Sequence, residues 1–293
     1  MATVAIVLNE SRPRAVELAH EAVAWLEARD HTVCIPDDEA ATVGLSEHAC
    51  PPERLGSDAD LAVSLGGDGT ILRTVGMVAH HQVPVLGVNI GRLGYLAHVE
   101  PEALCPALER FVTGDYSVEE RLLLCVQIDP GPYAGTDGRA PLAGAGPLLA
   151  LNEAVVEKPS AGQVVHIGVT VDGRFFTSYA ADGMIVATPT GSTAYAFSAR
   201  GPIIDPVHRA LLLTPVSPHM AFDRSLVFGA GQTLRLEILD RPAQLIVDGR
   251  ELGRLPPGSA ITCDAAREVA RFVTLGPDDF YGVLKAKFGL ADR

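Results

Sequence analysis

The sequence predicts an α/β plus all-β protein, with an open Rossmann-like α/β domain at residues 1–121 and a β-sandwich-like domain at residues 122–274. In the first part, short apolar runs alternate with apolar residues at helical spacing, which indicates parallel strands joined by helices. In the second part, short strand-like runs are separated by glycine, proline and aspartate, a pattern typical of antiparallel sheets. The 293 residues suffice for two domains of ordinary size.

The elements of the first domain follow from its apolar spacing. Residues 36–52 form an acidic, proline-containing connection, in which we expect the run from Asp37 to Glu39 to lie on the surface. Ligands of open α/β sheets bind outside the carboxyl ends of the strands, so the turn at 66–70 and the loop at 89–94 should face one cleft. The predicted strands are 4–8, 31–35, 61–65 and 84–88, and the predicted helices are 15–26, 71–79 and 101–112.

The second domain is predicted from short strands and the turns between them. Asp172-Gly173 is a two-residue hairpin signal, and Asp248-Gly249 marks another turn. Residues 129–146 are rich in Gly, Pro and Ala and indicate a loop, residues 192–198 a helical turn, and residues 280–288 a tail with an apolar face. The predicted strands are 122–129, 148–157, 164–171, 174–179, 184–188, 226–228, 234–239, 245–247 and 261–263.

Composition and charge disfavour several classes of function. The formal net charge of −13 argues against nucleic acid or an anionic membrane as the main partner. No run approaches 18 apolar residues, and no basic residues precede the first apolar run, so we expect neither a membrane span nor a signal peptide. The five cysteines include no C-x-x-C pair, which predicts free thiols in a reducing cytoplasm and no zinc site.

The turn at 66–70, Gly-Gly-Asp-Gly-Thr, joins a buried strand to a helix N-terminus. Backbone N–H groups and the helix dipole favour an anion there, and the three glycines remove side chains that would keep a phosphate away. The negative charge of Asp68 would repel that anion, so we expect Asp68 to act on a metal ion or on a proton. The turn lacks the lysine of a Walker loop and the G-x-G-x-x-G spacing, so an ordinary tight turn is the alternative.

Two adjacent polar residues, Asn152 and Glu153, interrupt an apolar strand, so one of the two side chains must face inward. A buried carboxylate needs partners. The pair either ends a strand at the surface or directs an amide and a carboxylate toward hydroxyl groups or a base edge of a ligand. The sequence alone leaves both interpretations open.

The stretch 181–198 carries the densest set of hydroxyl groups. Asp182-Gly183 ends one strand and opens the next, and the run 188–193, Thr-Pro-Thr-Gly-Ser-Thr, groups four hydroxyls. Such a density suits phosphate or ribose binding, and the ring of Tyr195 could stack on a base. An ordinary Ser/Thr-rich turn is the alternative.

Together these motifs resemble those of the NAD kinases of bacterial type, ATP-dependent enzymes that phosphorylate the 2′-hydroxyl of the adenosine ribose of NAD to give NADP. The order and spacing of the motifs agree, and the resemblance extends from Val4 to Phe288. One departure is Arg200, which stands where the family usually shows glycine. The resemblance is carried by residues 66–70, 89–95, 152–153 and 182–195.

The resemblance implies a role for each matching residue. Asp68 is the proton acceptor of the reaction. The tail 275–293 joins the first domain, the second domain supplies most of the NAD pocket, and the chains assemble as homodimers or homotetramers. The residues implied to bind ATP phosphates are Gly66, Gly67, Gly69 and Thr70. The residues implied to bind NAD are Asp68, Gly69, Arg73, Asn152, Glu153, Asp182, Thr193, Ala194, Tyr195, Ala196, Phe197 and Ser198.

The expected substrates are NAD and ATP, with Mg²⁺ or Mn²⁺ bound to ATP, because no cluster of Asp and Glu resembles a preformed metal site. Two other functions compete with this interpretation. A lipid kinase of the diacylglycerol type would share the Gly-Gly-Asp-Gly turn, but this acidic chain shows no basic or amphipathic membrane face. A non-catalytic dinucleotide sensor would keep the pocket without turnover, and the intact Asp68 argues against it.

Overall fold

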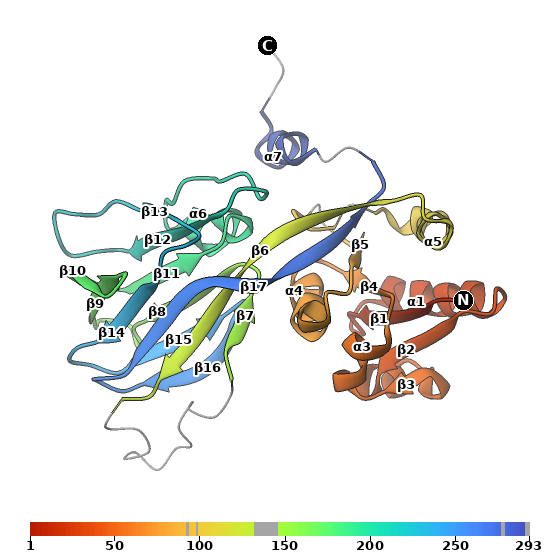
Figure 1. Cartoon of the computed structure of the whole chain (residues 1–293), viewed down its shortest axis with the longest axis horizontal. Coiled ribbons are helices and arrows are strands. Elements are labelled where there is room, and N and C mark those ends of the chain that lie inside the picture. The colour runs from red at the N-terminus through yellow and green to blue at the C-terminus, as the bar shows by residue number, and fades with distance from the viewer. Residues whose placement is uncertain (92–93, 98, 132–145, 277–278, 291–293) are drawn as a thin grey trace. The chain divides into compact units, whose positions relative to one another are not determined.

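The computed structural model describes residues 1–91, 94–97, 99–131, 146–276 and 279–290 (Figure 1). The chain divides into two compact units, one made of Met1–Arg121 and Glu268–Arg293 and the other of Leu122–Arg267. The first is an α/β unit and the second is built mainly of β-strands, so the predicted fold class is confirmed. Among the described helices, none combines the length and apolar character needed to cross a membrane.

The α/β unit is built on a parallel sheet with the strand order β3-β2-β1-β4-β5. The chain adds β2 and β3 on one side of β1, and then β4 and β5 on its other side. The strand order therefore reverses between β1 and β4, which is where open α/β sheets bind their ligands. The strands are β1 (Thr3–Leu8), β2 (Thr32–Pro36), β3 (Ala49–Cys50), β4 (Leu61–Gly66) and β5 (Val85–Asn89).

The helices of this unit bury the apolar stripes that the sequence predicted, and the predicted strands and helices are present with ends shifted by at most about three residues. All six residues of β4 are buried, as expected of a strand in the middle of a parallel sheet. Helix α5 ends at Gly114, whose φ of 79° is the left-handed conformation that glycine favours. The helices are α1 (Pro13–Glu27), α2 (Asp37–Thr42), α3 (Pro52–Asp58), α4 (Asp68–Val78), α5 (Leu104–Thr113) and α7 (Phe280–Phe288).

The prediction of an irregular, surface-exposed connection at 36–52 was wrong. The segment contains α2, a short 3-10 helix (Ser46–His48) and β3, and Glu39 in α2 is buried. The carboxylate of Glu39 accepts a 2.7 Å hydrogen bond from the backbone N–H of Leu8 at the end of β1. Asp37, Asp38 and Glu39 all lie in the first turn of α2, where acidic residues are favoured. Of these, Glu39 is buried because a backbone donor distant in sequence, the N–H of Leu8, lies inside the unit.

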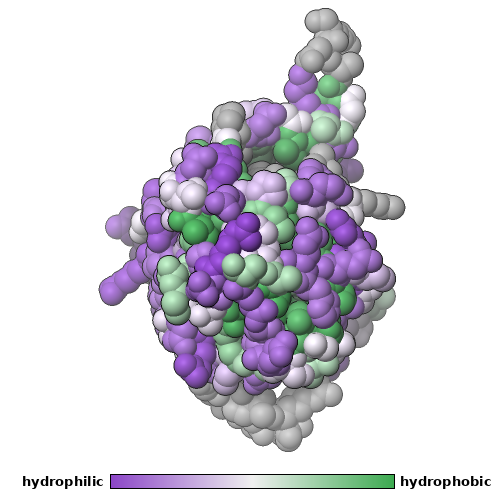
Figure 2. Space-filling view, turned by 90° about the vertical axis from the view of Figure 1, so that its right-hand side faces the viewer, coloured by the Kyte–Doolittle hydropathy of each residue, from purple (hydrophilic) through white to green (hydrophobic). Residues whose placement is uncertain are grey.

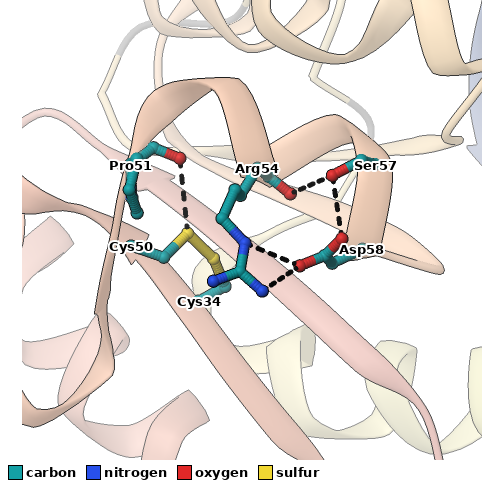
Figure 3. Close-up of polar contacts among 6 residues, drawn as sticks. All are labelled: Cys34, Cys50, Pro51, Arg54, Ser57 and Asp58. Atoms are coloured by element: carbon teal, nitrogen blue, oxygen red, sulfur yellow. Dashed lines mark hydrogen bonds and ion pairs between the residues drawn. A yellow bond between two sulfur atoms is a disulfide. The ribbon is translucent and has the colours of Figure 1, made fainter.

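The prediction that all cysteines are free thiols was also wrong. Cys34 of β2 and Cys50 of β3 form a disulfide, as Figure 3 shows beside the Arg54–Asp58 ion pair of α3. The two strands are paired in parallel with Pro36 opposite Cys50. The Cα atoms of Cys34 and Cys50 lie 5.7 Å apart. Sequence spacing could not reveal this pair, because strand pairing and not proximity in the chain brings the two thiols together.

The second unit contains two antiparallel groups of strands that share one apolar core. One sheet has the order β13-β12-β11-β8-β15-β16, and the other group pairs β10, β9, β14 and β17 in that order, with β6 beside β17 and β7 beside β6. The strands are β7 (Leu148–Ala150), β8 (Glu153–Glu157), β9 (Val165–Val171), β10 (Arg174–Ala181), β11 (Gly183–Ala187), β12 (Ala210–Val216), β13 (Leu226–Gly229), β14 (Leu234–Ile238), β15 (Ala243–Val247) and β16 (Arg250–Leu255), together with the parts of β6 (Ser117–Asp129) and β17 (Ala260–Thr274) that lie between Leu122 and Arg267.

Both turns predicted at Asp-Gly pairs are confirmed. Asp172-Gly173 connects β9 to β10, Asp248-Gly249 connects β15 to β16, and all four residues have positive φ. The helical turn predicted at 192–198 is present as the 3-10 helix η4 (Thr190–Thr193) followed by α6 (Tyr195–Ser198). The single strand predicted at 148–157 is instead broken into β7 and β8, and strands β12 and β16 were not predicted.

Most of the predicted loop at 129–146 lies outside the described residues. The surface that Figure 2 presents has hydrophobic residues interspersed with hydrophilic ones, as on the surface of many folded proteins.

Candidate functional site

A cavity of about 540 Å³ opens in the α/β unit at the carboxyl ends of β1 and β4. This is the point where the strand order reverses, so the cavity occupies the position expected of a ligand site in this class of sheet. It contains the N-terminus of α4, whose first turn favours an anion. The residues that line it are Leu8, Asn9, Glu10, Ser11, Arg12, Gly67, Gly69, Thr70 and Arg73.

The four residues predicted to bind ATP phosphates do not all reach this cavity. Gly67, Gly69 and Thr70 line it, and a Cβ atom on either of these glycines would meet open space. Gly66 is buried at the end of β4, where a Cβ atom would overlap the side chain of Thr70. Gly66 therefore allows the turn to close against Thr70, and the other three residues face the cavity.

Asp68 is the first residue of α4, and backbone donors of a neighbouring loop hold its carboxylate. Its two oxygens accept hydrogen bonds from the backbone N–H groups of Tyr95 at 3.0 Å and Leu96 at 3.2 Å. Gly94 permits this approach, because a Cβ atom there would overlap the carboxylate. The ring of Tyr95 lies under the ammonium group of Lys287 of α7, 3.8 Å from the ring centroid. The half-buried Asp68 thus has a fixed orientation.

Arg73, which the resemblance assigned to NAD binding, is held in place by contacts with β1 and α2. Its guanidinium donates a 2.7 Å hydrogen bond to the carbonyl of Leu8 and forms a 2.9 Å ion pair with the buried Glu39. Burial raises the pKa of Glu39, and the hydrogen bond from Leu8 and the charge of Arg73 oppose that rise. The resulting cluster ties α2, β1 and α4 together at the wall of the cavity, where Arg73 stays partly exposed.

Arg12 is a second cation at the same place, and the sequence reasoning missed it. It lies at the N-terminus of α1, lines the cavity, and also lines an adjoining one of about 540 Å³ together with Gly67, Ile90 and Gly91. An arginine just after the first strand of an alternating β/α pattern was the available signal. Arg12 and Arg73 give this part of an acidic chain a local positive charge, which suits a polyphosphate.

In the second unit, Asn152 and Glu153 lie at the break between β7 and β8, and Asp248 holds this break together. Its carboxylate accepts hydrogen bonds from three consecutive backbone N–H groups, those of Leu151 at 2.7 Å, Asn152 at 2.8 Å and Glu153 at 3.1 Å. The sequence predicted Asp248 only as a turn residue. Which amides its side chain would reach was decided by the pairing of β15 with β8.

The side chain of Glu153 is buried, and its Oε2 atom has no hydrogen-bond partner among the described residues. Burial, followed by the nearby charge of Asp248, raises the pKa of Glu153 to about 8, and a hydrogen bond from the backbone N–H of Tyr195 opposes the rise. Burial also raises the pKa of Asp248, against the effect of its three backbone hydrogen bonds. One of the two side chains was predicted to face inward, and the buried Glu153 does so; that the pair meets a ligand stays a prediction.

The hydroxyl-rich run at 188–193 is largely occupied with internal contacts. The buried Thr188 donates to the carbonyl of Leu151 and accepts a 3.1 Å hydrogen bond from the N–H of Gly191. Gly191 packs against the backbone of Asn152 so closely that a Cβ atom would overlap the carbonyl oxygen. The oxygen of Ser192 bonds to both backbone groups of Ile204. The hydroxyl of Thr188 therefore holds the backbone beside Asn152, and that of Ser192 holds the backbone at Ile204.

The remaining residues predicted to bind NAD have unequal access. The side chain of Ala196 is fully buried in a small apolar cluster, so only its backbone could meet a ligand. Tyr195, Phe197 and Ser198 are exposed, and Thr193 and Ala194 are half-buried. These residues are continuous along η4 and α6, and Gly191 fixes the start of that segment against Asn152.

Asp182 lies between β10 and β11, where the chain passes from one antiparallel group of strands to the other. Its carboxylate pairs with the ammonium group of Lys158 at 2.7 Å, and both side chains are partly exposed. Within the described residues, no group of three or more His, Cys, Asp or Glu side chains is arranged to hold a metal ion.

Comparison with known proteins decides the family. The N-terminal part matches the family model of the ATP-NAD kinase N-terminal domain over residues 4–116, and the C-terminal part matches that of the ATP-NAD kinase C-terminal domain over residues 151–275. The chain belongs to the ATP-NAD kinase family. It is 38% identical over 289 residues to the NAD kinase of Heliobacterium modesticaldum, with 98% of each chain covered. It is 42% identical over 258 residues to NAD kinase 1 of Streptomyces avermitilis, which covers 80% of this chain and 72% of that protein.

Solved structures of ATP-NAD kinase relatives have the same fold. The crystal structure of yeast NADH kinase complexed with NADH superimposes with a TM-score of 0.88 at 25% identity, covering 100% of this chain and 89% of that one. The structure of an NAD kinase from Archaeoglobus fulgidus in complex with ATP gives a TM-score of 0.72 at 26% identity, covering 98% and 97%. The ATP-NAD kinases are phosphotransferases, so the chain is an enzyme of that class, and the predicted family and activity are confirmed.

Arg200, just after the 195–198 helix, adopts a backbone conformation that glycine favours. Its φ of 65° lies in the left-handed region, where a non-glycine residue costs roughly 1–2 kcal/mol. Its N–H donates a 2.9 Å hydrogen bond to the carbonyl of Phe197, and Gly201 then donates to Ala196 at 2.8 Å. These two hydrogen bonds form the turn that ends the 195–198 helix.

Proposed function

We propose that this chain transfers the γ-phosphoryl group of ATP to the 2′-hydroxyl of the adenosine ribose of NAD, giving NADP and ADP. The observation that carries the proposal is the cavity at the end of β1 and β4, where a helix N-terminus and two arginines meet. A polyphosphate chain complements this arrangement in charge and in hydrogen bonding. The relative from Archaeoglobus fulgidus was solved with ATP and the yeast relative with NADH, which supports these ligand classes for this chain.

The two units are proposed to divide the substrates. Residues 1–121 with the tail 275–293 would bind the donor phosphates through Gly67, Gly69 and Thr70, with the divalent metal arriving as part of Mg-ATP or Mn-ATP. Residues 122–274 would bind NAD through Asn152 and Glu153, Asp182 and the segment 193–198. Exposed aromatic rings in that segment suit stacking on a base.

Asp68 is proposed as the proton acceptor. Its carboxylate is held by the N–H groups of Tyr95 and Leu96, and each oxygen keeps a lone pair that a hydroxyl can address. In the reaction the ribose 2′-oxygen bonds to the γ-phosphorus, the bond from that phosphorus to the β,γ-bridging oxygen breaks, and the hydroxyl proton passes to Asp68. Phosphoryl transfer leaves the protein chiefly with positioning and charge stabilisation, which a rigidly held carboxylate and two arginines can supply.

We place the reaction in the cytoplasm and expect a homodimer or a homotetramer. The disulfide between Cys34 and Cys50 bears on the first of these expectations, because reducing compartments keep most thiols free. Alkylation of the protein in fresh cell lysate, followed by mass spectrometry of the two cysteines, measures the oxidised fraction directly. A largely oxidised pair would argue against a reducing compartment.

The decisive test is formation of NADP from NAD and Mg-ATP by the purified chain. Phosphorylation of diacylglycerol in place of NAD would favour the lipid kinase, and binding of NAD without turnover would favour the sensor. The donor side can be tested separately with Arg12→Ala, which should raise the KM for ATP at least tenfold and leave the KM for NAD nearly unchanged. Arg14→Ala is the matched control, because Arg14 lies on α1 and pairs only with the exposed Glu17 in the described structure. Equal effects of the two substitutions would remove Arg12 from the donor site.

A further inference from the structure

The half-buried Asp248 and the buried Glu153 form a pair of neighbouring carboxyl groups in the second unit. Asp248 accepts three backbone N–H groups from residues 151–153, and its own N–H donates to the carbonyl of Glu153 at 3.0 Å. The break between β7 and β8 is thus fixed at four points by one residue of the β15–β16 turn. Asp248 has a φ of 46°, a conformation that aspartate tolerates better than most residues.

The two carboxyl groups are solvated very differently by the protein. A carboxylate that accepts several backbone N–H groups is stabilised in its charged form, and Asp248 has three such donors. Glu153 receives one, from Tyr195, and one of its oxygens has no partner in the described structure. A charge on the buried Glu153 beside a charged Asp248 would be costly, so the better-solvated, half-buried Asp248 carries the charge and Glu153 carries the proton.

The surroundings of Glu153 provide no positive charge that would reverse this assignment. On the sheet it lies opposite Ala187 of β11, and the next residue, Ala154, lies opposite Val247 of β15. From η4 and α6 it meets the backbone N–H of Tyr195, and from the β15–β16 turn it meets Asp248. No lysine or arginine of the described chain is among the groups that act on its pKa.

We propose that Asp248 is a positioning residue for NAD binding: its carboxylate fixes the Asn152–Glu153 backbone, and its negative charge keeps Glu153 protonated, so that Glu153 meets NAD as a neutral carboxylic acid. This deepens the proposed function and rests on it. A protonated Glu153 offers an O–H donor as well as an acceptor at its unpartnered oxygen. Such a group suits the uncharged polar parts of a dinucleotide, ribose hydroxyls or a carboxamide, and does not repel its pyrophosphate.

The protonation state can be measured without any ligand. In protein labelled with ¹³C at the glutamate carboxyl carbons, the Glu153 resonance is assigned by its loss in Glu153→Gln and followed between pH 5 and pH 9. It should titrate near 8, where burial and Asp248 place the pKa. With the ordinary glutamate pKa of about 4.3, the Glu153 carboxyl would already be ionised at pH 5 and show no titration up to pH 9, which would overturn the proposal whether or not the chain binds NAD.

NAD binding tests the consequence. By calorimetry without ATP, the Kd of the wild type should rise above about pH 8 and approach a tenfold loss per pH unit. Glu153→Gln keeps a neutral donor and acceptor at every pH, so its Kd should not change with pH. Glu237→Gln, at an exposed position of β14, is the matched control and should retain the pH dependence. A pH dependence retained in Glu153→Gln would contradict the proposal.

Asp248→Asn separates positioning from mere packing. Removal of its charge lets Glu153 ionise more easily, so the pH at which NAD binding is lost should move downward. A purely structural role would weaken binding equally at every pH and leave that midpoint in place, which would overturn the proposal. If Asp248→Asn does not fold, the ¹³C titration of the wild type decides. A wild type whose Glu153 titrates near 8 but which binds no NAD would instead refute the proposed function.

Discussion

Two aspartates in the two units are held in the same way and lie in different surroundings. Asp68 accepts the backbone N–H groups of Tyr95 and Leu96, and Asp248 accepts those of three consecutive residues at the start of β8. Both side chains are half-buried, but Asp68 lies in the first turn of α4, whereas Asp248 lies next to the buried carboxyl group of Glu153.

The comparison shows that backbone donors can prepare a carboxylate for two different tasks. At Asp68 the donors fix the orientation of the carboxylate and leave lone pairs for the hydroxyl that we propose reacts there. At Asp248 the donors favour the charged form against the burial that raises its pKa. The neighbouring groups, and not the number of hydrogen bonds, distinguish the proton-acceptor role proposed for Asp68 from the positioning role proposed for Asp248.

The largest expected effect comes from Asp68→Asn. General-base assistance is worth about 10²–10⁴-fold, so kcat should fall by at least that range while the Kd for NAD stays close to that of the wild type. Because an amide offers only one acceptor oxygen, one of the Tyr95 and Leu96 N–H groups loses its partner, and stability should fall by roughly 1–3 kcal/mol. Steady-state kinetics and thermal unfolding separate the two effects. A near-normal kcat would make Asp68 a structural residue like Asp248.

Glu153 should make the stability of the chain depend on pH. Its pKa is about 8 in the folded state and close to 4.5 in the unfolded state, so the folded state binds the additional proton between these values. Stability should therefore fall as the pH rises from about 4.5 to about 8, by at most about 1.4 kcal/mol per pH unit. Urea unfolding at several pH values should show the slope in the wild type and a reduced slope in Glu153→Gln. Identical slopes would contradict an elevated pKa.

Both cysteines of the disulfide lie in the α/β unit, so we expect its loss to affect the stability of that unit alone. It closes a segment of 16 residues that contains α2 and Glu39, the anchor of Arg73. A cross-link over a loop of that length contributes about 3 kcal/mol, so Cys34→Ser should lower the free energy of unfolding of this unit by about that amount. Cys105→Ser on α5 is the matched control, with a much smaller effect expected. The affinity for NAD should not change. A changed affinity would show that the β2–β3 edge of this sheet affects the NAD-binding residues around Glu153.

Gly191→Ala tests how tightly the hydroxyl-rich run is packed in the second unit. A methyl group there would overlap the carbonyl oxygen of Asn152, so the substitution should cost roughly 1–3 kcal/mol and raise the KM for NAD. Gly231→Ala is the matched control, because a Cβ atom there meets open space. Equal stability of the two variants would show that the backbone around Asn152 can move to accept the methyl group, and so that it is held less firmly than the backbone around Asp68.

Much of the architecture was determined by local sequence. The nearly all-apolar run 61–65 predicted a buried parallel strand, the Asp-Gly pairs at 172 and 248 predicted tight turns, and the glycines at 66–70 marked the strand-to-helix turn. Such patterns predicted the fold class, and the motifs at 66–70, 89–95, 152–153 and 182–195 together predicted the family. These signals are readable because each depends on the conformational preferences of a few neighbouring residues.

Tertiary structure alone decided the partners of the charged and polar side chains. Glu39, predicted at the surface, is buried because the N–H of Leu8 and the guanidinium of Arg73 contact it in the interior. Cys34 bonds to Cys50 because β2 pairs with β3. Asp248 reached residues 151–153 because β15 lies beside β8. The physical reason is common to all three cases: the energy of a buried charge or thiol depends on which distant groups surround it, and strand pairing, which no local pattern encodes, brings those groups together.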